Sequence, residues 1–117
     1  MRNEGVHDAV VPYAVILEED RNRGWYGDDD HRWSIIRYDE VAGGAAAAEE
    51  EAERLAREHI PDEFRRVVDH LGHPGRTIFR LADGSWLVRT WLLYETESVA
   101  FKVSIGRRIH HEEPRYK

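Results

Sequence analysis

The chain has 117 residues, no cysteine and a formal net charge of −6 at pH 7. A chain of this length is typical of one domain and can bury a core without disulfides or a structural metal. The lack of cysteine excludes disulfides, thiol catalysis and cysteine-ligated metals. With no secretory signal pattern and no apolar stretch long enough to span a bilayer, the sequence predicts one soluble, cytoplasmic domain with loose tails over residues 1–8 and 110–117.

The charge is distributed unevenly along the chain. Residues 1–75 contain 18 acidic and 9 basic side chains, whereas residues 76–117 contain 5 acidic and 8 basic ones. Opposite charges on the two parts favour an acidic helical layer folded against a mildly basic sheet. The acidic total also argues against nucleic acid as a general partner.

Two strands are predicted before the first helix. Apolar residues alternate over Ala9–Glu18, which indicates the first strand, and Trp33–Tyr38 is expected to form the second. Pro12 cannot donate a hydrogen bond to a neighbouring strand. The first strand should therefore lie at a sheet edge or begin just after this proline.

The connection over residues 19–32 is polar and long for a hairpin loop. Trp25 and Tyr26 would supply rigid contact area beside Asp28, Asp29 and Asp30. Three consecutive aspartates lack the alternating spacing of a calcium loop, and a solvated loop is the simpler interpretation of the acidic run. We assign these five residues to the recognition of a partner.

Helices are predicted in the middle of the chain. Ala42–His59 should form the main helix, and a second helical segment should begin at Pro61 and end at Gly72. The residues expected on the buried side of the main helix are Ala45, Ala48, Ala52, Leu55 and Ala56. The resulting order ββααβββ predicts an α+β fold, with a mainly antiparallel sheet and helices packed on one face.

Asp83-Gly84 predicts a two-residue type I′ hairpin turn, because both central residues of that turn need a positive φ. Counting outward from this turn gives three pairs on an apolar core face, which are Leu81 with Trp86, Phe79 with Val88, and Thr77 with Thr90.

A second turn over Glu95–Ser98 would continue the sheet. It gives the pairs Tyr94 with Val99, Leu92 with Phe101, Thr90 with Val103, and Val88 with Ile105. Both hairpins select one core face, and a one-residue slip would expose the apolar residues of the last strand.

The reverse face of this sheet has more apolar residues than a solvated face normally has. Its expected members are Ile78, Arg80, Leu87, Arg89, Trp91, Leu93, Ala100 and Lys102, with Trp91 directly opposite Lys102 in a cation–π pair. A helix or the N-terminal segment of the same chain, a second chain in a dimer, or a ligand could cover it. We assign Arg80, Arg89, Trp91 and Lys102 to a contact surface.

Histidines supply a weaker candidate site. His70 and His73 stand three residues apart and could face one metal, but Gly72 should end the helix between them, which favours a helix terminus followed by a turn. No metal, cofactor or catalytic residue is therefore assigned. A small metal-dependent or acid/base enzyme centred on His70, His73 or His31 stays as an alternative.

The chain resembles a group of uncharacterised small actinobacterial α+β proteins. The similarity lies in the tryptophan-led strand Trp33–Tyr38, the Ala/Glu-rich helix Ala45–Glu58, and the segment from Gly75-Arg76-Thr77 to Ile105, and it covers most of the chain. The resemblance implies a fold of this class and no particular activity.

The sequence thus predicts a small binding or regulatory module. Its partner would be a protein or a second copy of the chain, held through the reverse sheet face, and a homodimer is expected. The alternatives are the small enzyme described above and a binder of single-stranded nucleic acid, because Arg80, Arg89, Trp91 and Lys102 combine aromatic and basic side chains.

Overall fold

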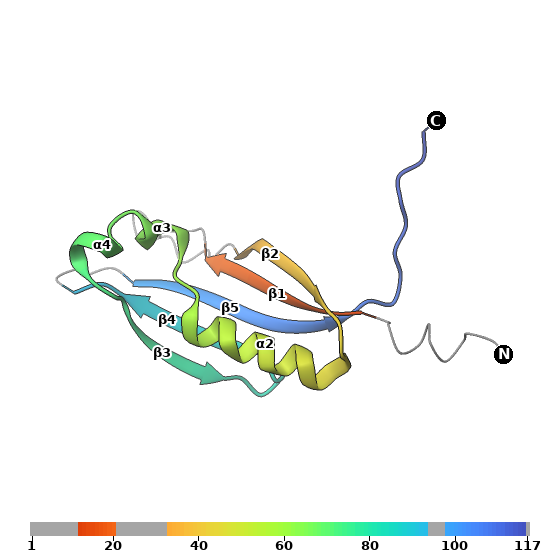
Figure 1. The fold of residues 1–117 in the computed structure, drawn as a ribbon, viewed down its shortest axis with the longest axis horizontal. Helices are drawn as coiled ribbons and strands as arrows, with labels where there is room; N and C mark the ends of the chain where they lie inside the picture. Colours follow the sequence, from red (N-terminus) through yellow and green to blue (C-terminus); the bar gives the residue numbers. More distant parts are fainter. Residues whose placement is uncertain (1–11, 21–32, 94–97, 117) are drawn as a thin grey trace.

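The structure is a computed structural model that describes residues 12–20, 33–93 and 98–116. It contains a five-stranded antiparallel sheet with the strand order β2-β1-β5-β4-β3 and helices packed on one face (Figure 1). The elements are β1 (Tyr13–Asp20), β2 (Trp33–Val41), α2 (Gly44–Glu58), α3 (Asp62–Arg65), α4 (Val68–Leu71), β3 (Gly75–Arg80), β4 (Trp86–Trp91) and β5 (Ser98–Arg107). The predicted α+β class is confirmed.

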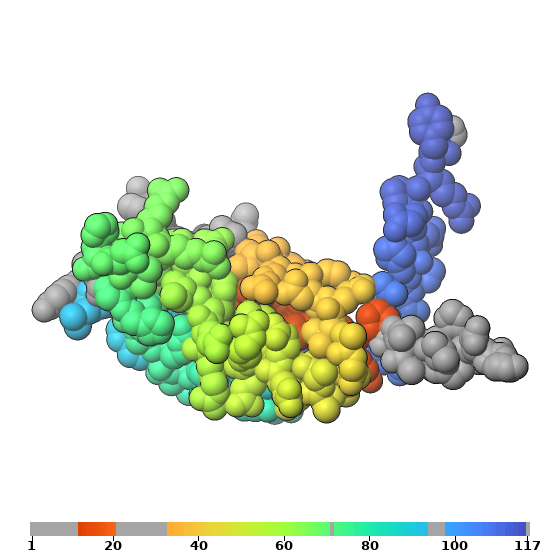
Figure 2. Space-filling model, in the orientation of Figure 1, coloured from red at the N-terminus to blue at the C-terminus, as the bar shows by residue number. Residues whose placement is uncertain are grey.

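Strand β1 begins directly after Pro12 and lies between β2 and β5. The sequence allowed the first strand either to lie at a sheet edge or to begin just after Pro12, and the structure shows the second arrangement. Although Pro12 lies outside the strand, its carbonyl accepts a hydrogen bond from the Arg108 backbone N–H at 3.2 Å. Beyond β5, residues 108–116 extend away from the body of the protein as a tail without helix or strand (Figures 1 and 2).

Helix α2 covers the middle of one sheet face (Figure 2). Ala48, Ala52, Leu55 and Ala56 are buried on its inner side, as the helical spacing predicted. Small side chains let the helix approach the sheet closely, where it contacts the core residues Val15, Leu17, Trp86, Val88, Phe101 and Val103. Ala45 was expected in this stripe but is exposed, because it lies in the first turn, ahead of the part of α2 that covers the sheet.

The segment after α2 forms two short helices instead of one. Pro61 precedes α3, and α4 ends at Leu71, before Gly72 with φ 88°. The two turns are separated around Val67, which packs with Phe64 in a second apolar cluster together with Leu92 and Val99. The predicted end at Gly72 is confirmed, and the predicted continuous helix is wrong.

The hairpin between β3 and β4 differs from the predicted type I′ turn. The Gly84 N–H donates to the Leu81 carbonyl at 2.9 Å, the Leu81 N–H donates to the Ser85 carbonyl at 2.7 Å, and Gly84 has φ 89°. This pattern is typical of a three-residue loop in which a turn is followed by a left-handed residue that forms a bulge. The extra loop residue moves β3 by one position, so the observed pairs are Arg80 with Trp86, Ile78 with Val88, and Arg76 with Thr90.

The register between β4 and β5 also differs, but the faces are preserved. Val88 pairs with Phe101 and Thr90 with Val99, four residues away from the predicted partners. Leu92 leaves the ladder and is buried beside Phe64, which lengthens the connection between the strands. Because side chains alternate with a period of two, a shift of four leaves every residue on its predicted face.

Asp83 stabilises the β3–β4 loop through Ser85. The Ser85 Oγ and backbone N–H donate to Asp83 Oδ1 at 2.6 and 2.9 Å, and these bonds hold the pKa of Asp83 below its usual range. A depressed pKa in the folded state contributes stability above the unperturbed value of about 3.9, and this stability is lost as the pH falls through the folded pKa.

We therefore expect the wild-type protein to lose more thermal stability than Asp83→Asn when the pH is lowered from about 5 to 2. Differential scanning calorimetry across this pH range measures the difference. Parallel stability curves for the two proteins would contradict a role for the Asp83 carboxylate.

Candidate functional site

The outer face is the sheet surface opposite α2, and the strand registers define its members. They are Trp33, Ile35, Tyr38 and Glu40 in β2; Ala14, Ile16, Glu18 and Asp20 in β1; Ser98, Ala100, Lys102, Ser104 and Gly106 in β5; Leu87, Arg89 and Trp91 in β4; and Gly75, Thr77 and Phe79 in β3. The described helices all pack on the other side of the sheet (Figure 1).

Large apolar side chains are exposed on both edge strands of this face. Ile35 is 63% exposed, Tyr38 53% and Trp33 38% in β2, and Phe79 is 51% exposed in β3. Trp33, Ile35 and Tyr38 are near one another on the β2 edge, and exposed apolar patches mark interaction surfaces more often than single residues do, whereas Phe79 lies on the opposite edge. The outer face is therefore the strongest candidate for binding among the described residues.

The charges of the outer face are segregated by strand. Glu18 and Asp20 in β1 and Glu40 in β2 are acidic, whereas Arg89 in β4 and Lys102 in β5 are basic. The acidic and basic strands meet between β1 and β5, where Glu18 pairs with Lys102. One half of the face is thus acidic and the other half basic.

Three of the four residues predicted for the contact surface lie on the outer face, namely Arg89, Trp91 and Lys102. Arg80 does not. Its guanidinium lies on the helix side of the sheet, 4.0 Å from the centroid of the Trp86 ring, and donates to Glu49 of α2 at 2.8 Å. The predicted place of Arg80 on the reverse sheet face is wrong, because the one-residue shift in β3 turns this residue to the helix side.

The surroundings of Trp91 are also corrected. Trp91 pairs with Ser98, and Lys102 pairs with Leu87, so the predicted pairing of Trp91 with Lys102 is wrong. The cation near this ring is Arg89, whose guanidinium carbon lies 5.0 Å from the ring centroid. Two residues apart in one strand, Arg89 and Trp91 share the outer face.

Trp91 also lies tightly over Gly75, its partner in β3. A Cβ added to Gly75 would stand 2.7 Å from Trp91 Cε2, which is closer than van der Waals contact. The absent side chain of Gly75 therefore makes room for the indole ring on the outer face.

Gly75→Ala should destabilise the protein by about 1–3 kcal/mol, because the clash outweighs the roughly 0.5–1 kcal/mol that alanine gains over glycine in a strand. In a Trp91→Leu background the same change should be nearly neutral. Urea unfolding of the four proteins gives the coupling free energy, and a stabilising Gly75→Ala in the wild-type background would contradict the packing described.

The other predicted site residues are not assembled into a site. Trp25, Tyr26, Asp28, Asp29, Asp30 and His31 lie outside the described residues. His70 is in α4 and His73 follows Gly72, and both are exposed. Over residues 12–20, 33–93 and 98–116, no group of three or more potential ligands is placed to hold a metal.

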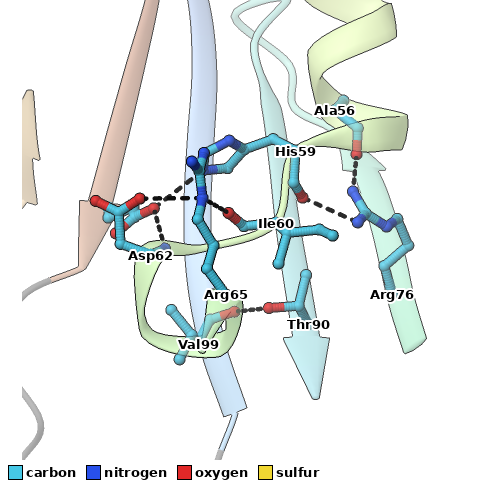
Figure 3. A network of polar contacts seen from close by, with 9 residues as sticks. Ala56, His59, Ile60, Asp62, Arg65, Arg76, Thr90 and Val99 are labelled. Carbon is cyan, nitrogen blue, oxygen red and sulfur yellow. Dashed lines mark hydrogen bonds and ion pairs between the residues drawn. The ribbon is translucent and has the colours of Figure 1, made fainter. Parts of the chain in front are cut away.

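A buried polar network was missed at the sequence level. His59 Nε2 lies 3.0 Å from Glu19 Oε2, and the two side chains are only 3% and 5% exposed (Figure 3). The same carboxylate oxygen accepts from the Asp62 backbone N–H at 3.4 Å, and the His59 ring meets Phe101 edge to face at 4.9 Å. A signal was present, because Glu19 continues the buried alternation of Val15 and Leu17.

Arg76 ties the end of α2 to β3 in the same region. Its guanidinium donates to the carbonyls of Ala56 and His59 at 2.8 and 2.9 Å (Figure 3). These are carbonyls at the helix C-terminus, where a cation is favourable. Burial lowers the pKa of Arg76, but an arginine keeps its charge under all ordinary conditions.

A hollow of about 350 Å³ adjoins the His59–Glu19 pair, and its arginines are already paired. Arg37 donates to Asp39 at 2.6 Å, Arg54 to Glu58 at 3.1 Å, and Arg65 lies 3.3 Å from Asp62. An anion entering the hollow would have to displace these carboxylates. The network is therefore a structural junction between β1, α2 and α3.

His59→Leu should destabilise the fold by about 3–5 kcal/mol, because it removes one partner of a buried carboxylate. The double variant Glu19→Leu/His59→Leu should recover much of that loss, since the buried carboxylate is removed together with its histidine partner. Chemical denaturation of both variants measures the effect. A double variant less stable than His59→Leu would contradict this interpretation.

Comparisons with protein-family models, curated proteins and solved structures find no match for this chain. The resemblance to small actinobacterial proteins therefore stays a prediction. Among the described helices, none combines the length and apolar character needed to cross a membrane.

Proposed function

We propose that this chain is a small cytoplasmic binding or regulatory module whose outer sheet face associates with protein, including a second copy of itself. The observation that carries the proposal is the exposure of Ile35 and Phe79, each more than half accessible, on the two edge strands of a sheet that α2 covers from the other side. Covering the exposed part of each side chain is favourable by roughly 1–2 kcal/mol, in proportion to the apolar area that leaves water.

The interior of the outer face suits a protein partner. Leu87 and Trp91 are partly buried within it, and small residues such as Ala100 and Ser104 lie between them and β1. Interfaces of moderate stability combine apolar and aromatic anchors with a charged periphery, and this face offers both kinds of group.

Charge favours protein over single-stranded nucleic acid as the partner. Arg89, Trp91 and Lys102 give one half of the face a basic and aromatic character. The other half carries Glu18, which would repel phosphate groups that follow the face across the strands, and Glu40, which is already paired with Arg108 at 2.7 Å. Arg80, a member of the expected platform, points to the opposite side of the sheet.

Ile35→Arg should weaken self-association at least tenfold, because it places a charge in the apolar part of the proposed interface. Ile109→Arg is the matched control, since Ile109 is 92% exposed in the tail after β5. Sedimentation equilibrium over a wide concentration range measures both. A wild-type protein that stays monomeric throughout, or an equal effect of the two substitutions, would contradict the proposed surface.

A further inference from the structure

We infer that the outer face binds a second copy of the chain around a two-fold axis parallel to the strands, so that the acidic half of each copy lies over the basic half of the other. This inference rests on the proposed function and specifies both the partner and its orientation. It follows from the order of residues across the sheet.

One row of paired residues crosses all five strands on the outer face. The pairs Ile35 with Glu18, Glu18 with Lys102, Lys102 with Leu87, and Leu87 with Phe79 run from β2 to β3. Strands lie about 4.8 Å apart, so the ends of this row are about 19 Å apart. The row has an exposed apolar residue at each end and a carboxylate beside an ammonium group in its interior.

A symmetric dimer that uses the same face twice must have its two-fold axis in the plane of the interface. In aligned packing, two sheets keep their strand directions within about 30° of each other, and aligned packing leaves two choices for that axis. If the axis is parallel to the strands, the row is reversed, and Ile35 of one copy lies across from Phe79 of the other. If the axis is perpendicular to the strands, Ile35 lies across from Ile35.

The charges distinguish these two arrangements. For Ile35 to lie across from Phe79, an axis parallel to the strands must run along the central strand β5, so β1 of one copy lies over β4 of the other. Asp20 then lies across from Arg89 and Glu18 across from Leu87 beside it, while Lys102 lies near the axis in both arrangements and does not distinguish them. A perpendicular axis places the acidic half over the acidic half and the basic half over the basic half. Like charges brought together at an interface oppose association, whereas opposite charges fix the orientation. The observed segregation therefore favours the parallel axis.

The parallel axis also covers the apolar residues that are exposed at the two edges of the sheet. Ile35 at the β2 edge and Phe79 at the β3 edge would cover each other twice in one dimer, because the two-fold axis repeats every contact. Facing sheets lie about 10 Å apart, a distance that these side chains can fill from both sides.

Cross-linking of engineered cysteines tests the orientation directly, because the chain has no cysteine of its own. Ile35→Cys and Phe79→Cys variants, one carrying a tag that changes its mass, are treated with a short bismaleimide separately and after mixing. We expect at least tenfold more covalent dimer from the mixture than from either variant alone. Ile109→Cys in the exposed tail gives the background from random collisions.

Charge reversal supplies an independent test with opposite signs for the two arrangements. Around a parallel axis, Arg89→Glu would face Asp20 of the other copy, and Glu18→Lys would lie over β4 beside Arg89 of the other copy. Each substitution should therefore weaken association at least tenfold. Around a perpendicular axis, each would relieve repulsion and strengthen association. Glu50→Lys, at an exposed position of α2, is the control and should leave association unchanged.

The outcomes separate this inference from the proposed function. Efficient cross-linking of Ile35→Cys with itself, or tighter association of Glu18→Lys, would overturn the orientation while self-association through the outer face stands. A monomeric native mass without cross-links would overturn both. A dimeric native mass without cross-links in any mixture would show that another surface joins the copies, which also overturns both.

Discussion

The structure depends on the packing of one helix against one face of the sheet. Ala48, Ala52 and Ala56 bring α2 close to the sheet, and Leu55 is buried in the same core cluster as Trp86 and Phe101. Because strand side chains alternate between the faces, each residue placed beneath α2 turns its neighbours to the other side. The packing of α2 against the sheet therefore determines both which residues form the core and which residues lie on the outer face.

The parts of the sheet where apolar residues alternate strictly could be predicted from the sequence. Val99, Phe101 and Val103 in β5, with Trp86 and Val88 in β4, lie under the helix as expected. A register error of four residues left this result intact, since it did not change which residues alternate inward. The placement of Trp91 opposite the core was correct for the same reason.

Strand β3 could not be placed correctly, and its sequence explains why. Ile78 and Phe79 are adjacent and both apolar, so either residue could face the core. The decision then rested on the Asp83-Gly84 turn, and this dipeptide serves two-residue and three-residue loops alike. The loop observed here buries Ile78 partly and exposes Phe79, and it turns the exposed Arg80 to the helix side of the sheet, beside Trp86 and Glu49.

The His59–Glu19 pair shows a different limit of sequence reasoning. Each residue continues a buried pattern of its own element, Glu19 after Leu17 and His59 after Leu55. Their contact joins positions 40 residues apart, and only the tertiary arrangement of α2 over β1 brings them together. With Arg76 on the helix C-terminus, this junction holds the helical layer on its side of the sheet and so leaves the outer face available.

The most direct test of this account is the accessibility of the Ile35 methyl groups to a soluble paramagnetic probe, measured by NMR as the protein concentration is raised. The account predicts strong relaxation at low concentration and protection at high concentration, while the Ile109 methyl groups stay accessible throughout. Ile35 methyl groups that are protected in the monomer, or accessible at every concentration, would contradict it.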